Sequence, residues 1–210
     1  MTPDFYPLAI AADRGMVVGL DQDAADAPGL AQLPLRGALF LPALLAHMLQ
    51  AAEQDALMYA ASFEHRAFFA HAMEMLLHDA LVNDMGLPRT VRMLAHFALF
   101  DDIVVHCARK TEAAFWPRLF ACVGGAARFF ERCVAHGRLR TAAQCLLVLQ
   151  TLEPPQVATR CVLVLLDRVA HAQSRALCVE VMRFLRATAT SDTAMHALYA
   201  RLSGTCSDSI

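Results

Sequence analysis

The sequence predicts an all-α protein: an α-solenoid of stacked antiparallel helix hairpins, preceded by a short β-hairpin. Three observations support this fold class. The 210 residues include 39 alanines and 17 arginines, and both residue types favour helix. Apolar residues recur with a helical period over most of the chain, in segments joined by short connections. Weak internal similarity recurs at an offset near 34 residues, which is the size of one helix-turn-helix unit.

Two apolar runs around a turn-like Asp13-Arg14-Gly15 predict the β-hairpin over residues 5–20. The following residues, 21–36, are rich in Asp, Ala, Pro and Gly and are expected to form a linker. We therefore expect two parts, a hairpin and linker over residues 1–36 and an α-solenoid domain over residues 37–210.

The positions of glycine and proline agree with the prediction that the chain after residue 36 is helical. Gly137 stands where a left-handed residue is expected after a helix, and Pro154-Pro155 stands where a helix can begin. The repeat is visible in Val134-Ala135-His136, which matches residues 169–171 at an offset of 35. The expected helices span residues 39–60, 63–83, 88–108, 112–122, 126–136, 139–152, 155–171, 174–188 and 192–202, the last with an N-cap at Ser191-Asp192.

The composition excludes several classes of protein. With 57% hydrophobic and 18% charged residues, the chain is too apolar to be intrinsically disordered. A net charge of −2 argues against nucleic acid as a partner. No uninterrupted apolar stretch reaches the roughly 20 residues of a membrane-spanning helix, and no secretory signal is recognisable. Seven cysteines without a Cys-x-x-Cys pair predict free thiols in the core of a cytoplasmic protein.

One helix carries residue types that bind metals. His71, Glu74 and His78 share a helix face, and imidazole and carboxylate are ligands of metal sites inside helical bundles. Such a site needs matching ligands from a facing helix, and the sequence offers only scattered histidines such as His47. Metal binding therefore stands as an alternative function. No catalytic motif occurs, so neither an enzyme nor a cofactor is expected.

The densest polar cluster lies around residues 104–116. Arg109 and Lys110 are placed to complement the carbonyl end of a helix, while Thr111 is expected to cap the next helix with Glu112 in its first turn. Arg and Trp are enriched in binding hot spots, so Arg109, Lys110, Glu112 and Trp116 form a candidate partner contact. The other interpretation of this cluster is a set of helix caps with a core tryptophan.

Long contiguous motifs resemble the C-terminal helical domain of the ribosome control protein 1 family. They cover nearly the whole chain. The motifs are YPLAIAADRGMVVGL (6–20), GALFLPALLAHML (37–49), HAMEMLLHDAL (71–81), VVHCARKTEAAFWPRLF (104–120), RFFERC (128–133), LRTAAQCLLVLQTLEPP (139–155) and LCVEVMRFLRA (177–187).

The resemblance implies a function in membrane traffic. Family members are large proteins with β-propellers before this α-solenoid, and with a smaller subunit they form a guanine-nucleotide exchange complex for member 6 of the Rab/Ypt GTPases. The chain is thus expected to be a non-catalytic scaffold in endosome-to-Golgi retrograde transport. Its expected partners are the smaller subunit and the GTPase, and its expected location is the cytoplasm, peripheral at the Golgi membrane.

Further expectations concern the chain as a unit. Because the sequence begins just before the hairpin, we expect a C-terminal fragment, a mispredicted gene product or a truncated paralogue. The resemblance also lowers the weight of the metal hypothesis, since the helix with His71, Glu74 and His78 matches a core element of the family. A self-assembling structural protein, which buries its apolar surface in an oligomer, is the remaining alternative.

Overall fold

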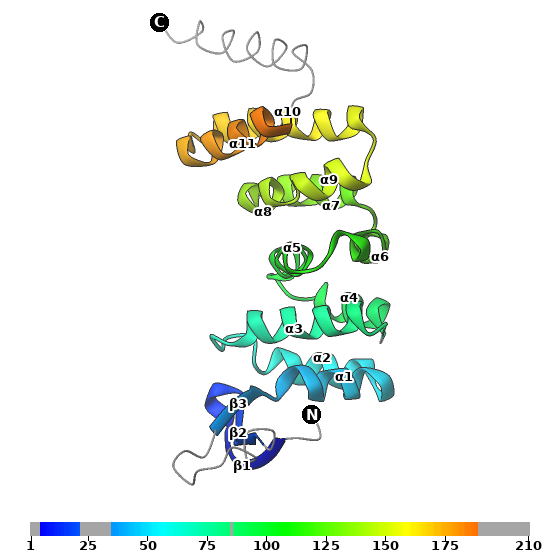
Figure 1. Cartoon of the computed structure of the whole chain (residues 1–210), viewed down its shortest axis with the longest axis vertical. Helices are drawn as coiled ribbons and strands as arrows, with labels where there is room; N and C mark the ends of the chain where they lie inside the picture. Colours follow the sequence, from blue (N-terminus) through cyan, green and yellow to red (C-terminus); the bar gives the residue numbers. More distant parts are fainter. Residues whose placement is uncertain (1–4, 22–34, 85, 189–210) are drawn as a thin grey trace, which may run out of the picture. The chain divides into compact units, whose positions relative to one another are not determined.

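The computed structural model describes residues 5–21, 35–84 and 86–188, and divides the chain into two compact units, Met1–Phe115 and Trp116–Ile210. Helices dominate both units, and a small antiparallel sheet precedes the helices of the first (Figure 1). This confirms the predicted fold class. The helix expected over residues 192–202 and its cap lie outside the described residues.

The sheet contains the predicted hairpin and one strand that the sequence analysis missed. Strands β1 (Phe5–Ala11) and β2 (Met16–Asp21) pair antiparallel around a short 3₁₀ turn, Ala12–Arg14. A third strand, β3 (Leu35–Leu39), pairs with β2, which gives the order β1-β2-β3. The expected linker therefore ends at a strand. Its residues, Leu-Arg-Gly-Ala-Leu, do not alternate regularly between apolar and polar, so only the pairing with β2 reveals β3.

An aromatic cluster joins the sheet to the helices that follow. Phe63 lies at its centre, with its ring 6.3 Å from Phe40, 5.2 Å from Tyr59 and 6.0 Å from Phe68. The hairpin turn reaches this cluster through Gly15, which is buried and has a φ of 63°. A Cβ atom at Gly15 would lie only 2.4 Å from the Phe68 ring. The close approach of turn and ring therefore requires glycine at this position.

The first unit contains five α-helices among its described residues, and α3 is central to them. It packs against α1, α4 and α5 and buries seven of its side chains. Figure 1 shows α1 with α2 and α3 with α4 as successive layers. The helices are α1 (Leu41–Ala51), α2 (Glu53–Ala61), α3 (Phe69–Val82), α4 (Leu87–Leu94) and α5 (Phe100–Lys110), followed by the 3₁₀ turn η3 (Ala113–Phe115).

Two predicted helices of this unit are each divided in the structure. The single helix expected over 39–60 is wrong, because Ala52 adopts an extended conformation and separates α1 from α2. The single helix expected over 88–108 is also wrong. A turn after α4 buries Phe97 against Phe69, with the ring centroids 5.1 Å apart, and allows α5 to return to α3.

The second unit follows the predicted boundaries more closely, with one exception. The helix expected over 139–152 bends at Cys145, whose N–H is shared between the carbonyl oxygens of Thr141 and Ala142, both at 3.1 Å. The helices are α6 (Trp116–Cys122), α7 (Ala126–Ala135), α8 (Leu139–Gln144), α9 (Leu146–Leu152), α10 (Pro155–His171) and α11 (Arg175–Thr188).

The weak sequence repeat corresponds to a repeated helix end. After α7, Arg138 N–H donates to the Cys133 carbonyl at 2.8 Å and Gly137 N–H to Val134 at 3.0 Å, with Gly137 at φ 72°. This is a Schellman motif. The end of α10 repeats it: Ser174 N–H donates to Val169 at 3.4 Å and Gln173 N–H to Ala170 at 3.1 Å, with Gln173 at φ 53°. The same capping bonds therefore turn the chain after both helices.

The described cysteines are free, as predicted, and four of the six are buried: Cys107, Cys133, Cys145 and Cys161. Burial raises the pKa of the Cys145 and Cys161 thiols above the ordinary thiol value. A buried thiol that stays protonated behaves as a small apolar side chain. Among the described residues, no helix has both the length and the apolar composition needed to cross a bilayer.

Gly15→Ala tests the contact between the sheet and the aromatic cluster. We expect a loss of about 2 kcal/mol in the free energy of unfolding, because the new Cβ combines a left-handed φ with overlap of the Phe68 ring. Gly86→Ala is the matched control, since Gly86 has a φ of 70° and no heavy atom lies within 4 Å of the position that its Cβ would take. It should cost about 1 kcal/mol. Chemical denaturation of both variants checks this, and an equal loss in the two would contradict the proposed contact.

Candidate interaction site

The two regions singled out in the sequence meet at an ion pair between α3 and α5. Nζ of Lys110 lies 2.5 Å from Oε1 of Glu74. The Glu74 side chain is only 13% exposed, whereas that of Lys110 is 62% exposed. Lys110 is the only lysine in the chain. The lysine therefore reaches from the end of α5 to neutralise a carboxylate that α3 holds at the edge of the core.

The structure does not assemble the predicted metal ligands into a site. Glu74 is engaged by Lys110, His71 is exposed, and Nδ1 of His78 lies 3.6 Å from Oδ1 of Asp79. Across the described ranges, no group of three or more His, Cys, Asp or Glu side chains is arranged to hold a metal ion. The geometry therefore gives the metal-binding alternative no support.

A buried thiol lies beside the Glu74–Lys110 pair. The pKa of Cys107 is raised to about 12, first by burial and then by the negative charge of Glu74, while Lys110 acts in the opposite direction. Cys107 is therefore protonated at neutral pH and is not a nucleophile. His106 is exposed on another side of α5, so the two neighbours in sequence do not form a catalytic pair.

The end of α5 is capped from within its own last turn. Arg109 and Lys110 lie in that turn, as predicted, where positive charge complements the helix dipole. Thr111 does not cap the next helix, which corrects the sequence prediction. Its Oγ1 instead donates to the carbonyl oxygens of Cys107, at 3.0 Å, and Ala108, at 3.2 Å. The backbone at Thr111 is extended, so its hydroxyl can reach back to α5.

The four candidate contact residues have different environments. Arg109, Lys110 and Glu112 are exposed at the end of the first unit. Trp116 begins α6 in the second unit and is only 7% exposed, so its ring belongs to that core. A contact role for the three exposed residues stays a prediction, and Trp116 fits the alternative interpretation of a core tryptophan.

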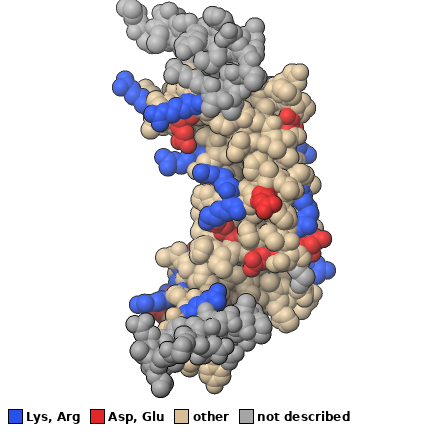
Figure 2. All heavy atoms as spheres, in the orientation of Figure 1, with Lys and Arg blue, Asp and Glu red and all other residues tan. Residues whose placement is uncertain are grey.

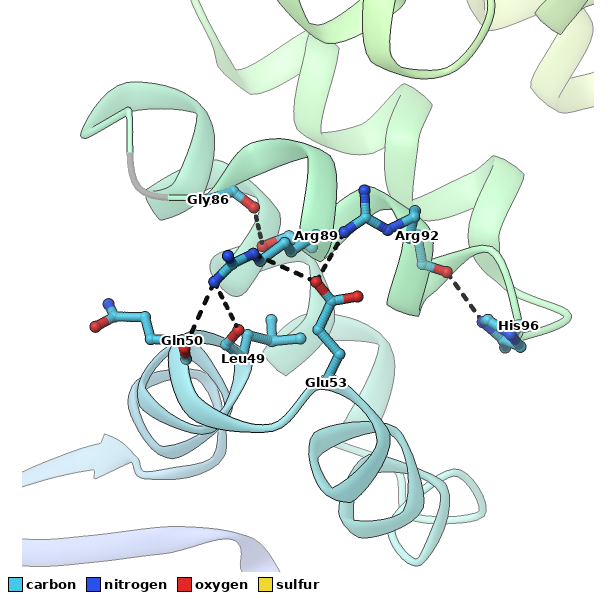
Figure 3. Close-up of polar contacts among 8 residues, drawn as sticks. Leu49, Gln50, Glu53, Gly86, Arg89, Arg92 and His96 are labelled. Carbon is cyan, nitrogen blue, oxygen red and sulfur yellow. Dashed lines mark hydrogen bonds and ion pairs between the residues drawn. The ribbon is translucent and has the colours of Figure 1, made fainter.

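A second polar cluster, absent from the sequence analysis, surrounds Glu53 (Figure 3). Oε1 of Glu53 lies 2.7 Å from Nη2 of Arg92 and 3.3 Å from Nε of Arg89. The Arg89 guanidinium also donates to the carbonyl oxygens of Leu49, at 3.4 Å, and Gln50, at 3.5 Å. Two arginines of α4 thus bind the first residue of α2 and the last turn of α1. They hold the corner at which the predicted single helix divides.

A shallow cleft opens beside this cluster. Its volume is about 180 Å³, below the 300–1,000 Å³ that is typical of small-molecule pockets. Most of its exposed lining is apolar, and its polar groups include Asp79 and Arg89. The cleft has room for a single side chain and is smaller than a typical small-molecule pocket. No local sequence signal could have revealed it, because its lining comes from α1, α3 and α4.

Known proteins resemble this chain over most of its length. Residues 42–203 match the model of the RIC1 C-terminal alpha solenoid region. The guanine nucleotide exchange factor subunit RIC1 of Homo sapiens, like that of Mus musculus, is 35% identical over 149 residues, covering 67% of this chain and 10% of the relative. The guanine nucleotide exchange factor subunit R06F6.8 of Caenorhabditis elegans is 29% identical over 211 residues, covering 90% of this chain and 14% of the relative.

The chain therefore spans only a small part of these curated relatives. No solved structure matches it significantly.

Lys110→Ala and Arg109→Ala separate the structural from the contact interpretation of α5. We expect Lys110→Ala to lower the free energy of unfolding by about 1 kcal/mol, because it leaves the largely buried Glu74 carboxylate without its cation. Arg109 has no ion pair among the described residues, and its replacement should change stability by less than about 0.5 kcal/mol. Thermal unfolding measures both, and equal losses would contradict the assignment of Lys110 to the core edge.

Glu53→Gln tests the cluster that holds the α1–α2 corner. We expect a loss of about 1 kcal/mol that shrinks as salt is added, since both arginines lose their carboxylate partner and the pairs are partly exposed. Asp55→Asn is the matched control, because Asp55 also lies in the first turn of α2 and faces solvent. Urea denaturation at low and high salt compares them. If the two variants behave alike, the effect belongs to the helix dipole rather than to the arginines.

Proposed function

The chain belongs to the RIC1 family, and from this premise we propose that it is a non-catalytic interaction module of a guanine-nucleotide exchange complex. The match of residues 42–203 to the family's alpha solenoid region carries the proposal. Its curated relatives are named as guanine nucleotide exchange factor subunits. Because the chain spans a small part of those relatives, the proposed role is that of one domain within a larger assembly.

The proposed mechanism is binding rather than bond chemistry. An exchange factor shifts a GTPase toward its nucleotide-free state by binding that state more tightly than the loaded one. This requires a rigid surface and no catalytic group. Stacked helices supply such surfaces, since each pair packs on its neighbours and leaves its outer residues free for partners. In the described part of the chain, burial raises the pKa of the Cys107 and Cys145 thiols. Both thiols lie in the core, so they do not contribute to such a surface.

The proposal extends to the pathway and the partners that the family resemblance implies. The GTPase is of the Rab/Ypt class, member 6, and the second partner is the smaller subunit of the complex. The module would then act in endosome-to-Golgi retrograde transport, from the cytoplasm and at the periphery of the Golgi membrane.

A binding assay with purified components tests the proposed function. We expect the chain to retain the smaller subunit, the nucleotide-free GTPase or both, and to bind the GTP-loaded form more weakly. A GTPase of another family, stripped of nucleotide in the same way, is the control. Binding to neither partner would contradict the proposal. Light scattering of the chain alone distinguishes the remaining alternative, because a self-assembling protein would form oligomers at micromolar concentration.

A further inference from the structure

The net charge of −2 conceals an uneven division of charge between the two units. The first 115 residues contain fourteen acidic residues and seven basic ones. In contrast, residues 116–188 of the second unit contain ten arginines, no lysine and four acidic residues. The excess positive charge of the described part of the chain is therefore concentrated on the helices α6 to α11.

Part of this charge lies on two neighbouring helices. Helices α8 and α11 pack against each other and against α10, and Figure 1 shows α11 in the layer next to α8. On α11, Arg175, Val179 and Arg183 are four residues apart and exposed, whereas Leu177 and Val181 are buried. Residues four apart lie on one side of a helix, so these three form a continuous exposed stripe.

The only charged residue of α8, Arg140, is also exposed. We call the exposed side chains of Arg140, Arg175, Val179 and Arg183 the α8–α11 face. At the level of these helices, Figure 2 shows Lys and Arg side chains along one edge of the view, with acidic side chains between them.

The positive charge of this face is not neutralised within the described residues. None of its three arginines forms an ion pair there, and Glu180 is the only acidic residue of α8, α9 and α11. The helices α7 and α10 differ, because Arg160 of α10 pairs with Glu131 of α7 at 3.3 Å. The guanidinium groups of these three arginines are therefore exposed to solvent and available to an anionic partner.

The side chains of the face favour a protein over a lipid surface as that anion. Guanidinium groups bind carboxylates with two parallel hydrogen bonds, and Arg is enriched in protein interfaces. Attraction to anionic lipid counts Lys and Arg equally, and it is usually reinforced by aromatic side chains that enter the bilayer interface. No Trp, Tyr or Phe is exposed among residues 116–184. Val179, 49% exposed, supplies an apolar centre between two arginines, which is the pattern of a protein contact.

We infer that the α8–α11 face binds an acidic surface of a protein partner. Carboxylates of the partner pair with Arg140, Arg175 and Arg183, and an apolar side chain covers Val179. The inference deepens the proposed function and rests on it for the identity of the partner, which is the smaller subunit or the GTPase. The chemistry of the face itself does not depend on that identity.

The first experiment uses an acidic probe and does not require the proposed partners. A fluorescein-labelled peptide of twelve glutamates is titrated with the full chain at physiological salt. Arg175→Glu with Arg183→Glu should weaken binding at least tenfold. Arg128→Glu with Arg168→Glu is the matched control, since both arginines are exposed on α7 and α10 and the change in net charge is the same. The control should stay within threefold of the original chain.

The outcomes of this titration are distinct. If the α11 variant and the control weaken peptide binding equally, only the overall charge of the chain matters and the inference is overturned. The inference is also overturned if the original chain does not bind the peptide. Arg175→Gln with Arg183→Gln removes the positive charges without reversing them. If the α8–α11 face binds the peptide, this variant should lose an intermediate amount of affinity, and it serves as the test if the charge reversal unfolds α11. Circular dichroism checks the fold of each variant.

The second experiment repeats the comparison with the smaller subunit, the nucleotide-free GTPase and vesicles that contain phosphatidylserine. Loss of partner binding in the α11 variant, with the control unchanged, supports the inference. If the partners bind the original chain and the α11 variant equally, the inference fails while the proposed function stands. If the partners do not bind but the peptide does, the proposed function fails and the face stands. If the α11 variant loses more affinity for the vesicles than for either protein, the choice of a protein partner is overturned.

Discussion

The burial of a single helix, α3, organises the first unit. Seven of its side chains lie in the core, and α1, α4 and α5 all pack on it. Each buried Leu, Met or Phe contributes about 1.5–3 kcal/mol through removal from water, whereas a partly exposed ion pair contributes about 1 kcal/mol or less. The apolar face of α3 therefore decides which helices surround it. The Glu74–Lys110 pair has a smaller role, since it satisfies the one carboxylate that α3 brings to the edge of this core.

In the second unit, burial of apolar helix faces is combined with a repeated helix end. Helices α7 and α10 pack together, and each ends in the same pair of capping hydrogen bonds, at Gly137 and at Gln173. Each turn sends the chain back along its neighbour, so α8 and α11 also become neighbours. Helices α8 and α11, which bear the exposed Arg140 and Arg175, are thus in contact although they are far apart in sequence. A repeat that serves folding therefore also brings two arginine-bearing helices together.

Most helices could be predicted from the period of their apolar residues and from Gly and Pro at their ends. The breaks at Ala52 and Cys145 could not, because neither position has a glycine or proline to mark it. The α1–α2 corner is held by Arg89, and the turn after α4 is held by the packing of Phe97 on Phe69. The candidate site shows the same limit. Both Glu74 and Lys110 stood out in the sequence, yet nothing local indicated that they would pair.

The sequence by itself determined the all-α class, the early hairpin, the free thiols with most of them buried, and the family. These properties depend on composition, on periodicity and on contiguous motifs, which are local and leave a direct trace in the order of residues. Only the tertiary structure decided that Glu74 pairs with Lys110, that Trp116 belongs to a core, and that α8 and α11, which bear exposed arginines, pack together. The reason is physical. Pairing and exposure depend on which helix faces are brought together, and helix packing selects these faces through burial summed over residues far apart in the chain.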